Sequence, residues 1–151
     1  MEDRFETFTL LISRINRNIR KIKNQEMAEY DLRGSHVSCL YYLYPNGGLT
    51  ATDLCERCEE DKASISRTLD LLEAQGYITC PSKTGKRYKS PIELTDKGRE
   101  IAKIINHRIE QVLDHVSLEL TEEERASFYR SLSTISNSLD VLAKSGREGT
   151  V

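Results

Sequence analysis

The residues of this chain that could do chemistry gather in one stretch, residues 61–76. It opens with small polar or cationic side chains, namely Ser64, Ser66, Arg67 and Thr68. An arginine guanidinium can donate two parallel hydrogen bonds to a guanine edge, and hydroxyl groups can bond to bases or phosphates. This composition suits close approach to a DNA groove, although an ordinary surface helix can share it. The neighbouring elements must decide between these two interpretations.

The same stretch has the spacing of an amphipathic helix. Ile65, Leu69 and Leu72 recur at helical intervals and form one apolar stripe. Asp61 can cap the start of this helix, and Gly76 can end it. The sequence therefore predicts a single helix whose apolar side faces the core and whose opening turns stay polar.

A second group of cationic side chains follows in a loop between two short strand-like segments. Residues 77–80 and 92–94 predict a hairpin, and its loop carries Lys83, Lys86, Arg87 and Lys89. Residues 61–91 hold six Lys or Arg against three acids, while residues 93–125 hold five against nine. A local basic face matters more for phosphate contact than the net charge of −2 of the whole chain.

Two further helices are predicted ahead of this stretch. Ser35 can cap the first, which turns Val37, Leu40, Leu43 and Tyr44 inward and ends at the turn cluster of residues 45–48. Thr50 and Asp53 form a capping pair that opens the second, from residue 51 to about residue 59. Thr50 and Thr52, at the front of that helix, are also candidate phosphate donors.

Long helices are predicted at both ends of the chain. The helix at the N-terminus has an apolar seam of heptad period, typical of dimerisation or bundle packing. Its residues are Phe5, Phe8, Ile12, Ile15, Ile19 and Ile22. Gly34 breaks this helix. After the hairpin, a fifth helix in chain order is capped by Thr95 and has the apolar stripe Ile101, Ile105, Ile109, Val112 and Val116. The sixth opens with a capping box at residues 120–124 and turns inward Phe128, Leu132, Ile135, Leu139 and Leu142.

Length and hydropathy restrict the class of protein. A chain of 151 residues is one domain by length. No apolar run approaches the roughly 20 residues that span a bilayer, and the opening Met-Glu-Asp-Arg lacks a basic lead followed by an apolar block. We therefore expect a cytoplasmic protein without membrane association, whose thiols are reduced.

The four cysteines leave two interpretations open. The spacing Cys55-x-x-Cys58 is compatible with zinc, but a closed zinc site needs four ligands, and Cys39, Cys80 and His36 do not supply a second paired spacing. Buried thiols in the core are the favoured interpretation, with no metal and no cofactor expected. A thiol- or metal-responsive regulator that uses Cys55 and Cys58 remains the alternative.

The local phrases of the chain resemble the MarR family of bacterial transcription regulators at five separate places. The residues that carry the resemblance are Leu40-Tyr-Tyr-Leu43, Gly48-Leu-Thr50 with Asp53-Leu54, Asp61-Lys-Ala-Ser-Ile-Ser-Arg-Thr-Leu-Asp70 with Leu72-Glu73, Gly76-Tyr-Ile78, and Leu94-Thr-Asp-Lys-Gly98. The wing departs from the family pattern, because Gly85-Lys-Arg-Tyr-Lys89 stands where the family generally has Asp-x-Arg.

The resemblance implies a mainly α fold with a small β-hairpin wing. It implies an N-terminal helix (1–33), a winged helix-turn-helix domain (34–95), C-terminal dimerisation helices (96–145) and a tail (146–151). The expected protein is a homodimer that binds a pseudo-palindromic operator in double-stranded DNA and usually represses, with a small-molecule effector as a further partner. Ser64, Ser66, Arg67 and Thr68 would face the major groove, and the wing cations would contact phosphates or the minor groove.

Other classes of function have less support in the sequence. No Ser-His-Asp context or Gly-rich phosphate loop is present, and the acids Glu122 to Glu124 are explained by their capping box, so an enzyme is not expected. A winged-helix module that binds protein instead of DNA is a second alternative, which the basic wing disfavours.

Overall fold

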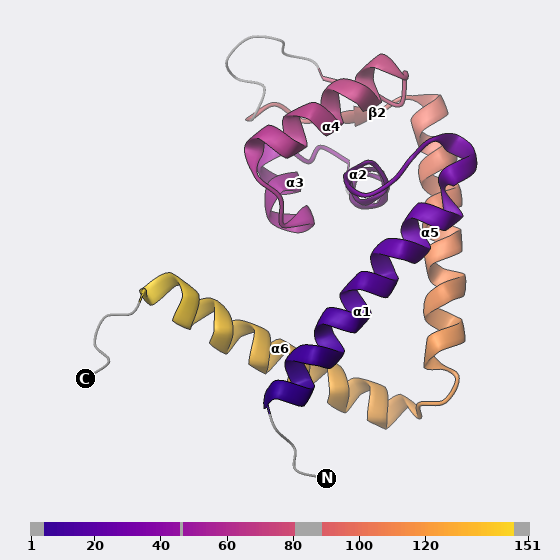
Figure 1. The fold of residues 1–151 in the computed structure, drawn as a ribbon. Coiled ribbons are helices and arrows are strands. Elements are labelled where there is room, and N and C mark those ends of the chain that lie inside the picture. Colours follow the sequence, from indigo (N-terminus) through magenta and orange to yellow (C-terminus); the bar gives the residue numbers. More distant parts are fainter. Residues whose placement is uncertain (1–4, 46, 81–88, 147–151) are drawn as a thin grey trace. The chain divides into compact units, whose positions relative to one another are not determined.

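The computed structural model describes residues 5–45, 47–80 and 89–146, and within them the fold is mainly helical with one two-stranded sheet (Figure 1). The elements in chain order are α1 (Phe5–Glu26), the 3₁₀ turn η1 (Ala28–Tyr30), α2 (Ser35–Leu43), α3 (Ala51–Cys58), α4 (Lys62–Ala74), β1 (Ile78–Thr79), β2 (Glu93–Leu94), α5 (Asp96–Ser117) and α6 (Glu122–Ser145). The predicted fold class is confirmed.

The chain forms two compact units, residues 1–109 and residues 110–151, and the division falls inside α5. The predicted division at residue 96, between a DNA-binding domain and dimerisation helices, stays a prediction. Ile101, Ala102 and Ile105 of α5 are buried in the core of the first unit. The first turns of α5 are therefore part of that unit.

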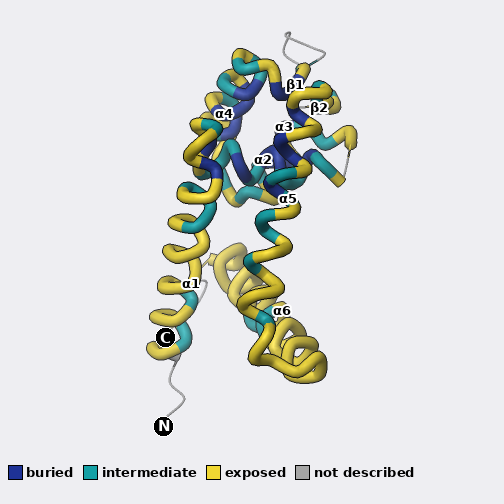
Figure 2. Tube along the Cα trace, turned by 90° about the vertical axis from the view of Figure 1, so that its right-hand side faces the viewer, coloured by how far each residue is buried: buried dark blue, intermediate teal, exposed yellow. Residues whose placement is uncertain are grey.

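The core of the first unit is built from apolar faces of α2, α3, α4, the two strands and the start of α5 (Figure 2). Ile65, Leu69 and Leu72 are each fully buried, as the stripe of α4 predicted. Leu40 of α2 and Leu54 of α3 are also fully buried. These side chains fix the faces that α2, α3 and α4 turn toward one another.

Side-chain caps define where most of the predicted helices begin. Thr50 and Asp53 form a capping box at α3, and Thr121 and Glu124 form one at α6. Asp61 caps α4, since its Oδ1 accepts a hydrogen bond of 2.7 Å from the backbone N–H of Ser64. These three predictions are confirmed, and in each the cap is closed by residues three positions apart.

The predicted cap of α2 is wrong. Gly34 occupies the N-cap position without a side-chain hydrogen bond, and the hydroxyl of Ser35 instead donates to Glu60 Oε1 at 2.6 Å. The competing partner lies 25 residues away, so local spacing could not reveal it.

The strands pair in antiparallel fashion, with Ile78 opposite Leu94 and Thr79 opposite Glu93. Both strands are shorter than predicted. Thr95 closes the hairpin and starts α5, because its hydroxyl donates to the Gly76 carbonyl at 2.6 Å and accepts from the Gly98 N–H at 3.0 Å. The residues connecting the strands, 81–88, lie outside the described part of the chain.

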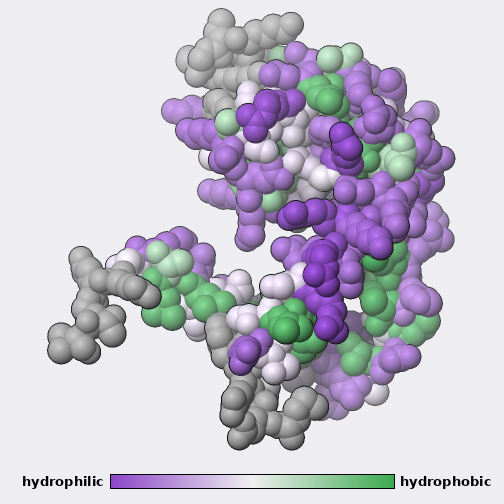
Figure 3. Space-filling view, viewed as in Figure 1, coloured by the Kyte–Doolittle hydropathy of each residue, from purple (hydrophilic) through white to green (hydrophobic). Residues whose placement is uncertain are grey.

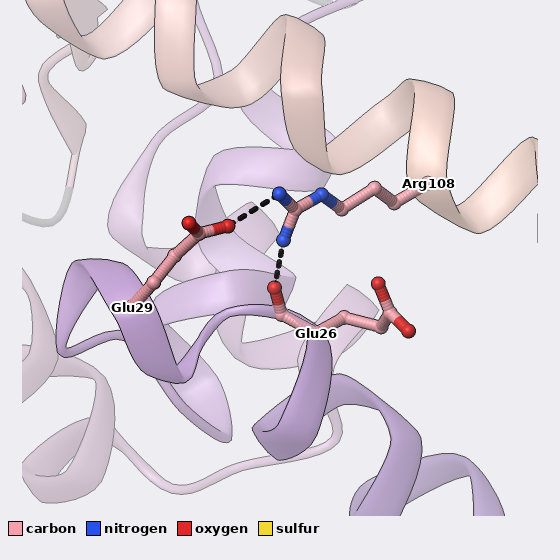
Figure 4. A network of polar contacts seen from close by, with 3 residues as sticks. All are labelled: Glu26, Glu29 and Arg108. Atoms are coloured by element: carbon pink, nitrogen blue, oxygen red, sulfur yellow. Dashed lines mark hydrogen bonds and ion pairs between the residues drawn. The ribbon is translucent and has the colours of Figure 1, made fainter.

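The end of α1 is held to α5 by Arg108, within the first unit (Figure 4). The guanidinium donates to the Glu26 carbonyl and to the Glu29 carboxylate, and it lies 5.7 Å from the centroid of the Tyr30 ring. A cation near the last carbonyls of a helix satisfies groups that have no partner within that helix.

The apolar seam of α1 is partly open. Ile15 and Ile19 are 48% and 46% exposed, whereas Ile12 and Ile22 are of intermediate exposure. A heptad seam left open in this way has the pattern of a helix that packs on another surface.

The apolar stripe of α6 is more open still. No residue of α6 is buried; Phe128, Leu139 and Leu142 are 48%, 43% and 68% exposed, and Figure 3 shows hydrophobic side chains on this helix. The expectation that the stripe faces inward is therefore wrong for the single chain. None of the described helices has an apolar window long enough to cross a lipid bilayer.

Candidate nucleic-acid interface

The candidate interface is built on α4, which α2 and α3 support from behind. Each pair among these three helices is in contact, and the turn between α3 and α4 consists of residues 59–61. The buried stripe of α4 faces this support, so the opposite face of the helix is left to solvent. This arrangement is the helix-turn-helix geometry in which the second helix can enter a DNA groove.

The polar residues of α4 are not equally available. Arg67 is exposed, and Ser64 and Ser66 are of intermediate exposure. The hydroxyl of Ser64 donates to a carboxylate oxygen of Glu60, so its proton is already engaged. Among these polar residues of α4, Arg67 is the exposed cation.

Thr68 corrects the sequence-based set, because its side chain is only 5% exposed. Residue 68 lies three positions after Ile65 and four before Leu72, and these spacings place it on the buried face of the helix. Its polarity suggested a groove-facing position, whereas its spacing already indicated the core.

Thr50 is committed to the cap of α3. Its hydroxyl donates to Asp53 Oδ2 at 2.9 Å, and its backbone N–H donates to the same oxygen at 2.8 Å. These hydrogen bonds lower the pKa of the Asp53 carboxyl group, because they favour its charged form. Of the two roles considered for Thr50, the structure shows capping. Thr52 is exposed on the first turn of the same helix.

The predicted wing is only partly covered by the structure. Lys89, four residues before the start of β2, is exposed. Lys83, Lys86 and Arg87 fall in residues 81–88, which are not described. What the structure fixes is the base of the hairpin, through the pairing of Ile78 with Leu94.

Glu60 is a residue that the sequence analysis missed. Its carboxylate accepts hydrogen bonds from Ser35 at the start of α2 and from Ser64 in the first turn of α4. It thereby links the start of α2 to the helix that carries Arg67. An acid beside the cap residue Asp61 was the available signal, but Ser35, one of its two partners, lies 25 residues away.

The cysteine contact in the structure is not the one that the spacing Cys55-x-x-Cys58 suggested. Cys58 approaches Cys39 of α2, with the two sulfur atoms 4.0 Å apart. Cys39 is buried, and Cys55 and Cys58 are of intermediate exposure. In residues 5–45, 47–80 and 89–146, no group of three His, Cys, Asp or Glu side chains is arranged to hold a metal ion.

Comparison with known proteins gives relatives that agree with this geometry. Residues 30–87, which run from η1 through α4 into the hairpin, match the profile of the MarR family. The HTH-type transcriptional regulator BilQ of Clostridioides difficile (strain CD3) is 23% identical over 131 residues, 87% of this chain and 88% of BilQ.

Two solved structures have a similar fold. The crystal structure of MarR is 27% identical, has a TM-score of 0.68, and covers 89% of this chain and 98% of its own. The complex of S. aureus MepR with DNA is 21% identical, has a TM-score of 0.76, and covers 87% and 97%. Profile, relatives and fold agree, and together they support a transcriptional regulator of the MarR family.

Proposed function

We propose that this protein is a DNA-binding transcriptional regulator, a repressor that binds a pseudo-palindromic operator as a homodimer. The observation that carries the proposal is the exposed Arg67 on α4, a helix capped by Asp61 and supported by α2 and α3. The MepR structure, a complex with DNA, has the same fold and supports this function. The match of residues 30–87 to the MarR family profile supports it further.

The proposed contact of α4 is with the major groove. Arg67 donates to a base edge in bidentate fashion, which would supply sequence selectivity. Ser66 lies beside it and is partly exposed. Ser64 is also partly exposed, but its hydroxyl proton is already donated to Glu60. Thr52 is proposed as a phosphate donor at the front of α3.

The wing is proposed to supply affinity without selectivity. Lys89 is exposed at the base of the hairpin, and Lys83, Lys86 and Arg87 extend the positive charge in sequence. Cations that neutralise phosphates release counterions, so this part of the affinity falls as the salt concentration rises.

The homodimer is supported by apolar surface that the single chain leaves open. Ile15 and Ile19 on α1, and Leu139 and Leu142 on α6, are each more than 40% exposed. Exposed apolar stripes on long helices are typical of helix–helix interfaces. A two-fold dimer would bring two α4 helices to successive half-sites of one duplex.

A small-molecule effector and a cytoplasmic location complete the proposal, and the effector rests on the resemblance to the MarR family alone. The rival function is a winged-helix module that binds protein. It predicts that no duplex is bound with salt-dependent affinity, and the positive wing argues against it.

The test starts with the selection of duplexes from a random pool by the purified protein, followed by affinity measurements on the selected operator. We expect Arg67→Ala to weaken operator binding by about 1–3 kcal/mol and to weaken binding to unrelated duplex much less. Arg130→Ala removes an exposed arginine of α6, outside the helix-turn-helix and the wing; it is the control and should change neither affinity by a comparable amount.

Two outcomes would contradict the assignment. Equal losses on operator and on unrelated duplex would make Arg67 a phosphate contact, because phosphate contacts carry no sequence information. Failure of the wild-type protein to enrich any duplex would remove the proposed function itself.

A further inference from the structure

Two cysteine side chains from different helices meet behind α4. Cys39 belongs to α2 and Cys58 is the last residue of α3, and their Sγ atoms lie 4.0 Å apart. A disulfide bond has a sulfur–sulfur distance of about 2.05 Å, so the two sulfur atoms need to approach by about 2 Å. Rotation of the side chains and a small shift of the helices can supply a movement of this size.

The two thiols have different surroundings. Cys39 is 0% exposed, whereas Cys58 is partly exposed and therefore within reach of a small solute. The contact with Cys58, together with burial, raises the pKa of the Cys39 thiol. The hydrogen bond from Cys39 lowers the pKa of Cys58, and burial and the Glu60 carboxylate oppose that effect.

A nearby ammonium group favours the thiolate of Cys58. Lys23, near the end of α1, lowers the pKa of Cys58 by its charge, and its Nζ donates to Ser38 of α2 at 3.2 Å. The end of a helix disfavours a negative charge, and this cation acts against that effect at Cys58. The roles therefore divide, with Cys58 as the attacking thiolate and Cys39 as the buried partner that keeps its proton.

We propose that Cys39 and Cys58 form a reversible oxidation site, which hydroperoxides close to an intramolecular disulfide and whose closure lowers the affinity of the protein for DNA. The clause on affinity rests on the proposed function. The clause on the disulfide stands on the geometry of α2 and α3 alone.

The chemistry needs no cofactor, since the hydroperoxide is the oxidant. The Cys58 thiolate attacks the terminal peroxide oxygen, the O–O bond breaks, and the leaving alkoxide takes a proton from water and departs as an alcohol. This step leaves a sulfenic acid on Cys58. Cys39 then attacks the Cys58 sulfur, the S–O bond breaks, and hydroxide leaves with the Cys39 proton as water. Two thiols lose two electrons, and one peroxide gains them.

Closure would act on DNA binding through the support of α4. Both α2 and α3 contact α4, and the core around Cys39 includes Leu40 and Leu54, which are fully buried. A close-packed core transmits small displacements instead of absorbing them. Drawing α2 toward the end of α3 would therefore shift α4 and the Arg67 that it carries.

The contact of Cys39 with Cys58 differs from the pair that the spacing Cys55-x-x-Cys58 suggests. The Cys58 sulfur contacts Cys39, and burial raises the pKa of Cys55, which makes its thiol less reactive. Cys55 lies on the same helix with the same intermediate exposure as Cys58. It is therefore a matched control.

The first experiment maps the bond. The full chain is treated with hydrogen peroxide, remaining thiols are alkylated, and the digest is analysed by mass spectrometry. We expect a linked peptide pair that contains Cys39 and Cys58 and is lost on addition of dithiothreitol, in the wild type and in Cys55→Ser. Cys58→Ser and Cys58→Ala should both lack it. Alkylation of both Cys39 and Cys58 after peroxide treatment of the wild type would overturn the site.

The second experiment measures the selected operator's affinity before and after oxidation, with circular dichroism confirming that each variant is folded. We expect a loss of about tenfold or more in the wild type and in Cys55→Ser, restored by dithiothreitol, and no change in Cys58→Ser. A disulfide that forms without changing affinity would overturn the regulatory clause. A reduced protein that binds no duplex would defeat the proposed function, while the mapping still decides whether the bond forms.

Discussion

At the scale of single residues, short hydrogen-bonded caps set the position of the candidate DNA-reading side chain. Asp61 holds the first turn of α4 through its bond of 2.7 Å to the Ser64 N–H. Glu60 accepts from the Ser64 hydroxyl in the same turn. Glu60 and Asp61 together therefore fix the first turn of α4, and Arg67 lies about one turn further along the helix.

We predict that Asp61→Ala lowers the free energy of unfolding by about 0.5–2 kcal/mol, because the Ser64 N–H loses its acceptor. Asp61→Asn keeps an acceptor oxygen at this position and should retain most of that free energy. Urea denaturation followed by circular dichroism measures both variants. An alanine variant as stable as the wild type would show that the cap contributes nothing.

The interactions that were predicted correctly join residues close together in the sequence, whereas those that were missed join residues far apart in it. The caps Thr50, Asp61 and Thr121 are closed within three positions, so sequence spacing contained the whole interaction. The hydroxyl of Ser35 has its partner 25 residues away, and the sulfur of Cys39 has its partner 19 residues away. Such pairs are set by packing, which no local spacing encodes.

At the scale of elements, the close approach of α5 to β1 determines where the hairpin sits. A Cβ atom added at Gly98 would lie 1.8 Å from the Tyr77 carbonyl oxygen. The backbone of the helix therefore touches the backbone that leads into the strand, and only glycine permits this distance. The phrase Leu94-Thr-Asp-Lys-Gly98 was recognised in the sequence, but its packing role was not.

We predict that Gly98→Ala destabilises the protein by about 1–3 kcal/mol or more, because the hairpin and α5 must separate to admit a methyl group. Gly47→Ala is the matched control, since a Cβ atom there meets nothing within 4 Å. Thermal denaturation of the two variants gives the comparison. If both variants melt alike, the contact with Tyr77 is not a constraint on the fold.

At the scale of the whole molecule, the sequence predicted the elements better than their burial. The stripe of α4 is buried as expected, whereas the equally regular stripe of α6 is exposed in one chain. Periodicity shows that a face is apolar, but it does not show whether the same chain or a second copy covers it. That distinction is a property of the assembly.

We predict that Leu139→Glu weakens self-association at least about tenfold, or about 1.4 kcal/mol, because it places a charge on the apolar stripe. Asn137→Glu adds the same charge on the opposite side of α6 and serves as the control. Sedimentation velocity over a dilution series measures both. Unchanged association of the Leu139 variant would remove α6 from the proposed interface.

The exposed apolar stripes of α1 and α6 also imply that the lifetime of this regulator depends on its concentration. If dimerisation covers these side chains, the free energy that holds the folded state includes a contribution that grows with protein concentration. At low copy number more chains exist singly, with Leu142 and Val141 about two-thirds exposed and open to proteases that recognise apolar surface. Dilution would then shorten the survival of the regulator as well as lower its occupancy of DNA, so its regulation would fail abruptly below a threshold amount.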